Sequence, residues 1–184
     1  MTTIKYKIVF HSPWHCGSGL SAGADLDTLV VKDENELPYI PGKTLKGLIR
    51  EAVEEYLSFC DKDCSSEVEK TFGHQYAAVV DYVVRGEAFF TNAELADDEK
   101  KAIKEMRLQK HLYKAKASTK IDENGVADDH TLRRMEVVVP CTLFAEIHDI
   151  DPSMVEVVTK AVGLIKRLGV NRNRGLGRCT FFIL

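Results

Sequence analysis

The sequence predicts an α+β fold, and three observations lead to this prediction. Residues 5–11 alternate polar and apolar side chains, as a half-buried strand does. Residues 45–57 carry apolar side chains at the i, i+3, i+4 and i+7 spacing of an amphipathic helix. Two strand-like segments, a second helical segment and a terminal strand-like segment then follow. The complete order predicts a ferredoxin-like (RRM-like) βαββαβ core.

The segment between the first strand and the first helix contains a glycine-rich loop and a predicted hairpin. The loop covers residues 15–23, and residues 28–32 and 37–40 indicate two short strands joined by a turn at Asp33. Pro41-Gly42 then breaks the chain. Thr44 is expected to cap the helix that follows.

The second half of the chain supplies the remaining core elements and an insertion. Strands are predicted at residues 79–84 and 87–91, and a β-rich stretch interrupted by Pro140 at residues 136–147. Asp151-Pro152-Ser153 opens the second core helix, and residues 178–184 form the terminal strand. Between them, residues 100–110 have helical character and residues 117–130 are polar. We therefore expect a single domain over residues 1–184 with an inserted subdomain at about 92–135.

Composition limits the class of protein. The chain has 184 residues, of which 45% are hydrophobic and 29% charged, so it can bury a core. It lacks an apolar run of about 18 residues, and its start does not resemble a signal peptide, so we expect no membrane association and a cytoplasmic location. The five cysteines are expected to be free thiols. Cys60 and Cys64 could share a helix face as metal ligands, but zinc would need two more.

Basic residues gather in two regions although the formal net charge is −3. Glu105 is the only acidic residue in the basic stretch from residue 100 to 120, and no acidic residue follows Glu156. A chain with this distribution can offer a basic surface to RNA despite its overall charge. The alternative for the first of these regions is a solvated helix face.

The first basic motif surrounds the Pro41-Gly42 break. A helix N-terminus presents free N–H groups and a positive dipole, and such an end binds phosphates. The side chains placed to assist are Lys43, Thr44, Lys46 and Arg50. The alternative is an ordinary capped helix with a solvated basic face.

The second basic motif is the glycine- and arginine-rich stretch at residues 168–178. Its glycines allow left-handed backbone, and arginine donates paired hydrogen bonds to phosphate. It precedes a strand, so it is not the dinucleotide-binding fingerprint. It indicates a loop facing a polyanion, or else a tight connection with surface arginines. The residues concerned are Gly169, Arg172, Arg174, Gly175, Gly177 and Arg178.

These motifs resemble those of the RAMP superfamily of CRISPR-associated proteins. The run Ile40-Pro-Gly-Lys-Thr-Leu-Lys-Gly-Leu-Ile-Arg50 is similar to the family signature at the first helix, and Arg172-Asn-Arg-Gly-Leu-Gly-Arg178 to its C-terminal glycine-rich loop. His15-Cys-Gly-Ser-Gly19, Thr71-Phe-Gly73 and the stretch from Glu136 to Phe144 match further family features in the same order. The sequence is most like a type III effector (Csm/Cmr-type) backbone subunit.

The resemblance implies a set of RNA contacts and partners. The expected partners are CRISPR RNA, target RNA, other effector subunits and copies of the chain itself. The first-helix motif and the glycine-rich loop are expected to hold the RNA backbone, with His15 in the early loop beside it. The insertion at 92–135, or the loop at 19–27, is expected to make further contacts as a thumb.

The resemblance also implies a candidate catalytic residue. In catalytic family members a loop aspartate cleaves target RNA with Mg²⁺ or another divalent cation, by attack of a ribose 2′-hydroxyl, and Asp27 matches its position, with Asp25 as the rival. Three alternatives stay open: a noncatalytic capping subunit, a metal-independent endoribonuclease that processes CRISPR precursor RNA with His15 as base, and a sensor of a small anionic ligand. Trp14 is expected to lie in the core or at a subunit interface, with stacking on a base as the alternative.

Overall fold

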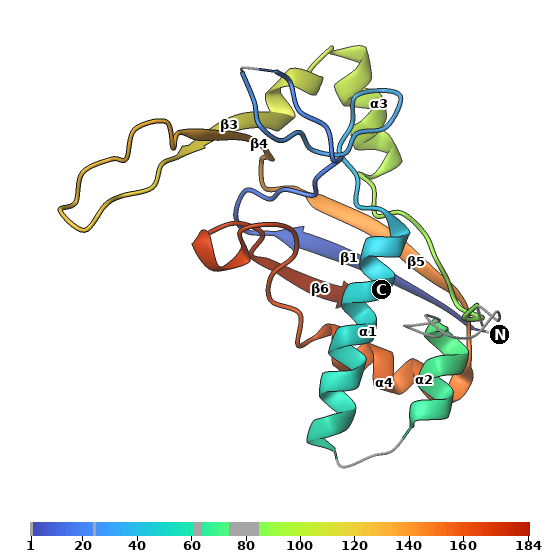
Figure 1. The fold of residues 1–184 in the computed structure, drawn as a ribbon. Coiled ribbons are helices and arrows are strands. Elements are labelled where there is room, and N and C mark those ends of the chain that lie inside the picture. Colours follow the sequence, from blue (N-terminus) through green and yellow to red (C-terminus); the bar gives the residue numbers. More distant parts are fainter. Residues whose placement is uncertain (1, 24, 61–63, 74–84) are drawn as a thin grey trace.

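The computed structural model describes residues 2–23, 25–60, 64–73 and 85–184 (Figure 1). Its main sheet is antiparallel and has the strand order β2-β5-β1-β6. These strands are β1 (Thr2–Phe10), β2 (Phe89–Phe90), β5 (Thr142–Ile150) and β6 (Cys179–Ile183). The central position of the first strand beside the last is that of a ferredoxin-like core, so the predicted fold class is confirmed. The strand predicted at 79–84 lies outside the described residues.

Three helices pack on the sheet, and Figure 1 shows them gathered along one side of it. They are α1 (Gly42–Phe59), α2 (Ser65–Phe72) and α4 (Pro152–Val162). The apolar stripe of α1 is buried because its members recur every three or four residues, as at Leu45, Ile49 and Val53. Alternate strand residues such as Tyr6 and Ile8 meet this stripe and complete the core. No helix in the described part of the chain has the length and apolar character needed to cross a membrane.

The first turn of α1 differs from the prediction. Thr44 does not cap the helix: Pro41 is the N-cap residue, and Thr44 lies inside the first turn with its N–H bonded to the Pro41 carbonyl. The N–H of Gly42 donates to Asn92 Oδ1 at 2.9 Å. A Cβ at Gly42 would collide with the carbonyl oxygen of Phe90. The glycine is therefore required by a close approach to the end of β2, and part of the helix N-terminus is already occupied.

The hairpin predicted before α1 is reduced to a turn. Asp33 is the turn residue, as expected, because its Oδ1 accepts the N–H groups of Asn35 and Leu37 at 2.8 Å each. Only Lys32 and Pro38 pair across this turn. The flanking residues pair elsewhere, since Val30 pairs with Gly17, Thr28 with Met135, and Ile40 with Ala93. Apart from this one bridge, the two predicted strands thus join three different neighbours.

A two-stranded extension projects from the body of the molecule (Figure 1). We call it the arm; it consists of β3 (Tyr113–Ser118), β4 (Arg133–Val138) and the residues 119–132 between them. It follows α3 (Asp97–Glu105) and a short 3₁₀ turn, η1 (Gln109–Leu112). The helix predicted at 100–110 begins earlier, where three acids favour its N-terminal turn, and ends before Arg107, which has left-handed backbone. The arm lies within and just beyond the expected insertion, but its first strand was not predicted.

Candidate nucleic-acid interface

Two of the loops singled out by their sequence lie against each other. We call residues 169–178 the glycine loop and residues 12–19 the early loop. The N–H of Gly177 donates to the Pro13 carbonyl at 2.8 Å, and the N–H of Val170 donates to the His15 carbonyl at 3.0 Å. Gly169, with φ +93°, has no room for a Cβ because the His15 carbonyl oxygen fills that space. The two motifs that resemble those of one family therefore pack together as one structural unit.

His15 is held inside this unit. Its side chain is only 2% exposed, and its Nδ1 lies 2.6 Å from the carbonyl oxygen of Glu136. An RNA phosphate or a ribose hydroxyl cannot reach a ring in this position without an opening of the loop. This placement gives His15 a structural role, as a partner of the Glu136 carbonyl, in place of the expected contact with RNA. Trp14 beside it is fully buried and stacks on Phe10 with ring centroids 4.8 Å apart, so it belongs to the core.

Asp27 lies at the base of the arm. Its N–H donates to the Arg134 carbonyl at 2.8 Å, and its Oδ2 accepts the Arg134 N–H at 2.6 Å. The side chain is exposed, and no bond to Oδ1 is found within the described residues. Asp25, the rival candidate, lies in a separate turn where its N–H bonds to Ala22. Of the two aspartates, only Asp27 is fixed to the arm.

Glu136 holds the parts of the candidate site together, a role that sequence reasoning did not assign to it. Its carboxylate accepts the Val30 N–H at 3.0 Å and the Lys32 ammonium at 2.9 Å, and the group is buried. The Lys32 ammonium also lies 4.1 Å from the ring centroid of Tyr113. Together with the His15 bond, these contacts tie two segments, the early loop and residues 30–32, to β4. An acid followed by three valines was the available signal, because a carboxylate is buried only where it is paired.

We expect Glu136→Gln to lower the free energy of unfolding by about 1–3 kcal/mol. Glutamine keeps one oxygen for the Val30 N–H but removes the charge that pairs with half-buried Lys32. Urea denaturation measures the difference. Glu105→Gln is the matched control, because its pair with Lys101 is exposed and its loss should cost less than about 1 kcal/mol. Equal losses in the two variants would contradict a central role for Glu136.

Arginines from the arm and from the glycine loop line a common depression, which we call the arm–loop cleft. Its volume is about 230 Å³, and a neighbouring depression of about 580 Å³ continues it along the arm. Lys116 Nζ bonds the Arg174 carbonyl at 3.2 Å and so joins the two walls. Within the described residues, none of the arginines of the cleft forms an ion pair. The residues that line the smaller depression are Asp27, Thr28, Ser118, Arg133, Arg134, Met135, Val170, Asn171 and Arg174.

A family model for the RAMP superfamily matches residues 7–180. The chain belongs to the RAMP superfamily. Among solved structures, it is similar to a chain of the type III-B Cmr-beta cryo-EM structure bound to cognate target RNA, with a TM-score of 0.72, 12% identity, and coverage of 100% of this chain and 97% of that one. For the apo state of type III-B Cmr-beta the values are 0.73, 12%, 99% and 97%. At this identity the similarity shows a shared fold. No curated protein matches the chain.

The first-helix motif of this RAMP domain does not line the arm–loop cleft. Arg50 is engaged internally, with bonds to Glu54 at 2.7 Å and to the Gly73 carbonyl at 2.6 Å. Burial, with a smaller effect of Arg50, lowers the pKa of Lys46. Lys43 is exposed and, within the described residues, unpaired. Of the three predicted basic contacts, Lys43 is therefore the best placed to meet an anion.

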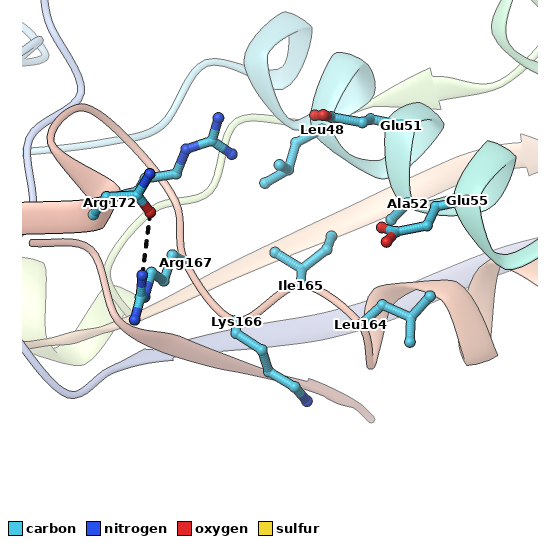
Figure 2. Close-up of a pocket in the computed structure, with 10 residues that line it drawn as sticks. Leu48, Glu51, Ala52, Glu55, Leu164, Ile165, Lys166, Arg167 and Arg172 are labelled. Atoms are coloured by element: carbon cyan, nitrogen blue, oxygen red, sulfur yellow. Dashed lines mark hydrogen bonds between the residues drawn. The ribbon is translucent and has the colours of Figure 1, made fainter.

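The arginines of the glycine loop separate into different environments. Arg174 lines the arm–loop cleft, whereas Arg172 points toward α1 and lines a second pocket of about 470 Å³ (Figure 2). In that pocket Arg167 bonds Asn173 at 3.2 Å, and the carboxylates of α1 face the cations. A phosphate there would meet acidic side chains, so Arg172 is less suited to it than Arg174. The α1 residues of this pocket are Leu48, Glu51, Ala52 and Glu55.

In the part of the chain that the structure describes, no metal site is formed by protein ligands alone. No group of three or more His, Cys, Asp or Glu residues there could hold a metal ion. Cys60 and Cys64, which the spacing allowed to share a helix face, do not do so, because Cys60 follows α1 and Cys64 precedes α2. Asp27 Oδ1 offers one oxygen ligand. That number suits Mg²⁺, which is commonly bound through one or two carboxylates, substrate phosphates and water.

Proposed function

We propose that this RAMP protein is a CRISPR RNA-binding subunit of a type III effector ribonucleoprotein complex in antiviral defence. Its partners are CRISPR RNA, target RNA, other effector subunits and copies of itself. The arm–loop cleft is the observation that carries this proposal. Three arginines without acidic partners among the described residues converge there from the arm and the glycine loop, together with Asn171.

Phosphate is the group that this cleft suits best. Guanidinium groups donate paired, charge-assisted hydrogen bonds to phosphate oxygens. An arginine without a carboxylate partner gives up no ion pair when it binds RNA. Contacts of this kind follow the backbone and shape of the RNA, so we expect weak preference for sequence.

We further propose that Asp27 takes part in cleavage of target RNA at this cleft. The ribose 2′-hydroxyl would give up its proton and attack the adjacent phosphorus, and the bond to the 5′-oxygen would break. The departing 5′-oxygen would take up a proton from water, and a 2′,3′-cyclic phosphate would remain. Asp27 Oδ1 is the oxygen available to orient or deprotonate the hydroxyl, and the arginines would stabilise the negative charge that develops on the phosphate. A Mg²⁺ held by Oδ1 and the RNA would supply further charge neutralisation.

Two narrower alternatives differ in their use of these residues. A noncatalytic capping subunit would need the cleft but not the Asp27 charge. A processing endoribonuclease would need His15 as a base, and the burial of that ring disfavours it. The cleft and the exposed carboxylate beside it favour RNA holding with target cleavage.

RNA binding by the Arg133→Ala/Arg174→Ala variant tests the cleft. We expect its affinity for a fluorescent single-stranded RNA of the guide repeat-and-spacer type to fall about tenfold or more at low salt. We call the steepness with which the logarithm of the binding constant falls with the logarithm of the salt concentration the salt slope. It should become smaller by about 0.7 for each phosphate that the variant no longer neutralises. Fluorescence anisotropy between low and moderate KCl concentrations measures both quantities.

A double variant on the same insertion controls for net charge. Lys104→Ala/Lys110→Ala removes two exposed cations that do not line the cleft, so it should leave both affinity and slope nearly unchanged. Equal effects in the two double variants would show a diffuse electrostatic attraction and would contradict a specific cleft.

A further inference from the structure

On the face of the sheet whose side chains point away from the helices, two phenylalanines flank a lysine. Lys7 in β1 pairs with Phe144 in β5 on one side and with Phe182 in β6 on the other. Side chains of directly paired residues lie on the same face of a sheet, so the three form a line across three strands. Phe144 is 38% and Phe182 46% exposed. With strands about 4.8 Å apart, the two rings lie roughly 10 Å from each other.

The same face has a second aromatic position. Phe89 in β2 pairs with His148 in β5, is 61% exposed, and stacks on the histidine ring with centroids 6.2 Å apart. His148 is four residues from Phe144 along β5, so it lies roughly 14 Å away on the same side. Exposed phenyl rings therefore occur at three places on one open surface, and none of them lines the arm–loop cleft.

Charges on this face leave one cation free. The Glu146 carboxylate is bonded to Lys5 at 3.1 Å and lies 3.2 Å from His148 Nε2. Within the described residues Lys7 has no acidic partner, and its ammonium lies 5.4 Å from the ring centroid of Phe182. Glu146 is thus paired with neighbouring side chains, whereas the Lys7 ammonium between the two phenylalanines is available to an anion.

We propose that this sheet face binds a single-stranded stretch of RNA by stacking. Bases would lie on Phe144 and Phe182, a phosphate between them would meet Lys7, and Phe89 would take a further base. An alternation of exposed aromatic rings with a cation matches the faces and the backbone of unpaired nucleotides. A protein partner fits less well, because charged residues are depleted at the centres of protein interfaces.

This sheet face lies next to the glycine loop, but the proposal for the face does not depend on the proposal for the cleft. β6 begins directly after the glycine loop, so an RNA strand leaving the loop meets Thr180 and Phe182 first. His11 Nε2 bonds Thr180 Oγ1 at 2.8 Å at that edge. The sheet face and the cleft are therefore two separate contact surfaces, and either proposal can fail without the other.

Substitution of phenylalanine by leucine separates stacking from apolar burial. With the purified full-length protein, Phe144→Leu/Phe182→Leu should lower the affinity for a fluorescent oligouridylate about tenfold or more, with the salt slope unchanged. Affinity for a short RNA duplex should stay the same, because its bases are not free to stack on protein. Lys7→Ala should decrease the salt slope by about 0.7. Phe59→Leu is the control, since this exposed ring lies at the end of α1.

The outcomes separate this inference from the cleft proposal. Unchanged affinity of Phe144→Leu/Phe182→Leu for oligouridylate overturns the stacking surface, whatever the Arg133→Ala/Arg174→Ala variant does. Unchanged RNA affinity together with altered oligomeric state would identify a protein-docking face and would also overturn it. If the leucine variant lost affinity and the Arg133→Ala/Arg174→Ala variant did not, the sheet-face proposal would be supported and the cleft proposal would be contradicted. A cross-link from 5-iodouridine RNA to Phe144 or Phe182 would confirm direct contact.

Discussion

Asp27→Asn is expected to lower the rate of target RNA cleavage at least about 100-fold in a reconstituted effector complex supplied with Mg²⁺. Asparagine retains a side-chain oxygen that can accept the Arg134 N–H, so the loop remains attached to the base of the arm. The substitution removes the negative charge that would orient the 2′-hydroxyl or hold the cation. Cleavage is followed as the appearance of cut target fragments with time, and guide RNA binding is measured on the same preparation.

Asp25→Asn is the matched control for this experiment. Asp25 is exposed and two residues away, but it makes no bond to the arm among the described residues. This variant should cleave at the wild-type rate, while EDTA should abolish cleavage by both the wild type and the control. Wild-type cleavage by Asp27→Asn would place the chain in the noncatalytic, RNA-holding class. Loss of cleavage in Asp25→Asn alone would transfer the catalytic role to Asp25.

Elements with strong periodicity were predictable from the sequence. The α1 stripe repeats over three turns, and β1 alternates over its length, so each specifies both its type and its buried face. The N-terminus of α4 was equally predictable from the sequence. Asp151 caps it, with Pro152 at the first position and the Ser153 N–H donated to the Asp151 carboxylate at 3.0 Å. These signals are local, and they were sufficient to give the order of the core elements.

The arm–loop cleft was not predictable because its walls are brought together by long-range pairing. Arg133 and Arg174 are 41 positions apart, and their proximity depends on the β3–β4 register and on the fold of the glycine loop. The exposed positions of β3 carry small and charged side chains that resemble a polar loop. Arg50 illustrates the same limit, since no local pattern shows that the Gly73 carbonyl will meet its guanidinium.

Hydrogen bonds to main-chain atoms fix the relative positions of the loops that form the candidate interface. The Asp27 segment is attached to β4 through Arg134, the early loop is attached to β4 through Glu136, and the glycine loop is attached to the early loop through Gly177. Each link joins a loop to a strand or to another anchored loop. The cleft is therefore largely formed before RNA binds, which limits the conformational entropy lost on binding.

Gly177→Ala is expected to lower the free energy of unfolding by at least about 3 kcal/mol. Gly177 has φ +69°, and a left-handed conformation costs an alanine about 1–2 kcal/mol. Its Cβ would in addition collide with the carbonyl oxygen of Leu168, and forced overpacking adds roughly 1–3 kcal/mol. Leu168 cannot withdraw easily, because its own N–H donates to the Gly177 carbonyl at 2.9 Å.

Gly175→Ala separates the two causes, because Gly175 has a similar φ of +85° but no neighbouring atom within 4 Å of the place that a Cβ would take. It should lose only about 1–2 kcal/mol, the conformational part alone. Urea denaturation of both variants gives the difference. If the two alanines were equally destabilising, the approach of Leu168 to Gly177 would not be limiting, and the glycine at 177 would be required only for its backbone conformation. A clear excess at 177 would show that the glycine loop closes against Leu168 with no room for a side chain.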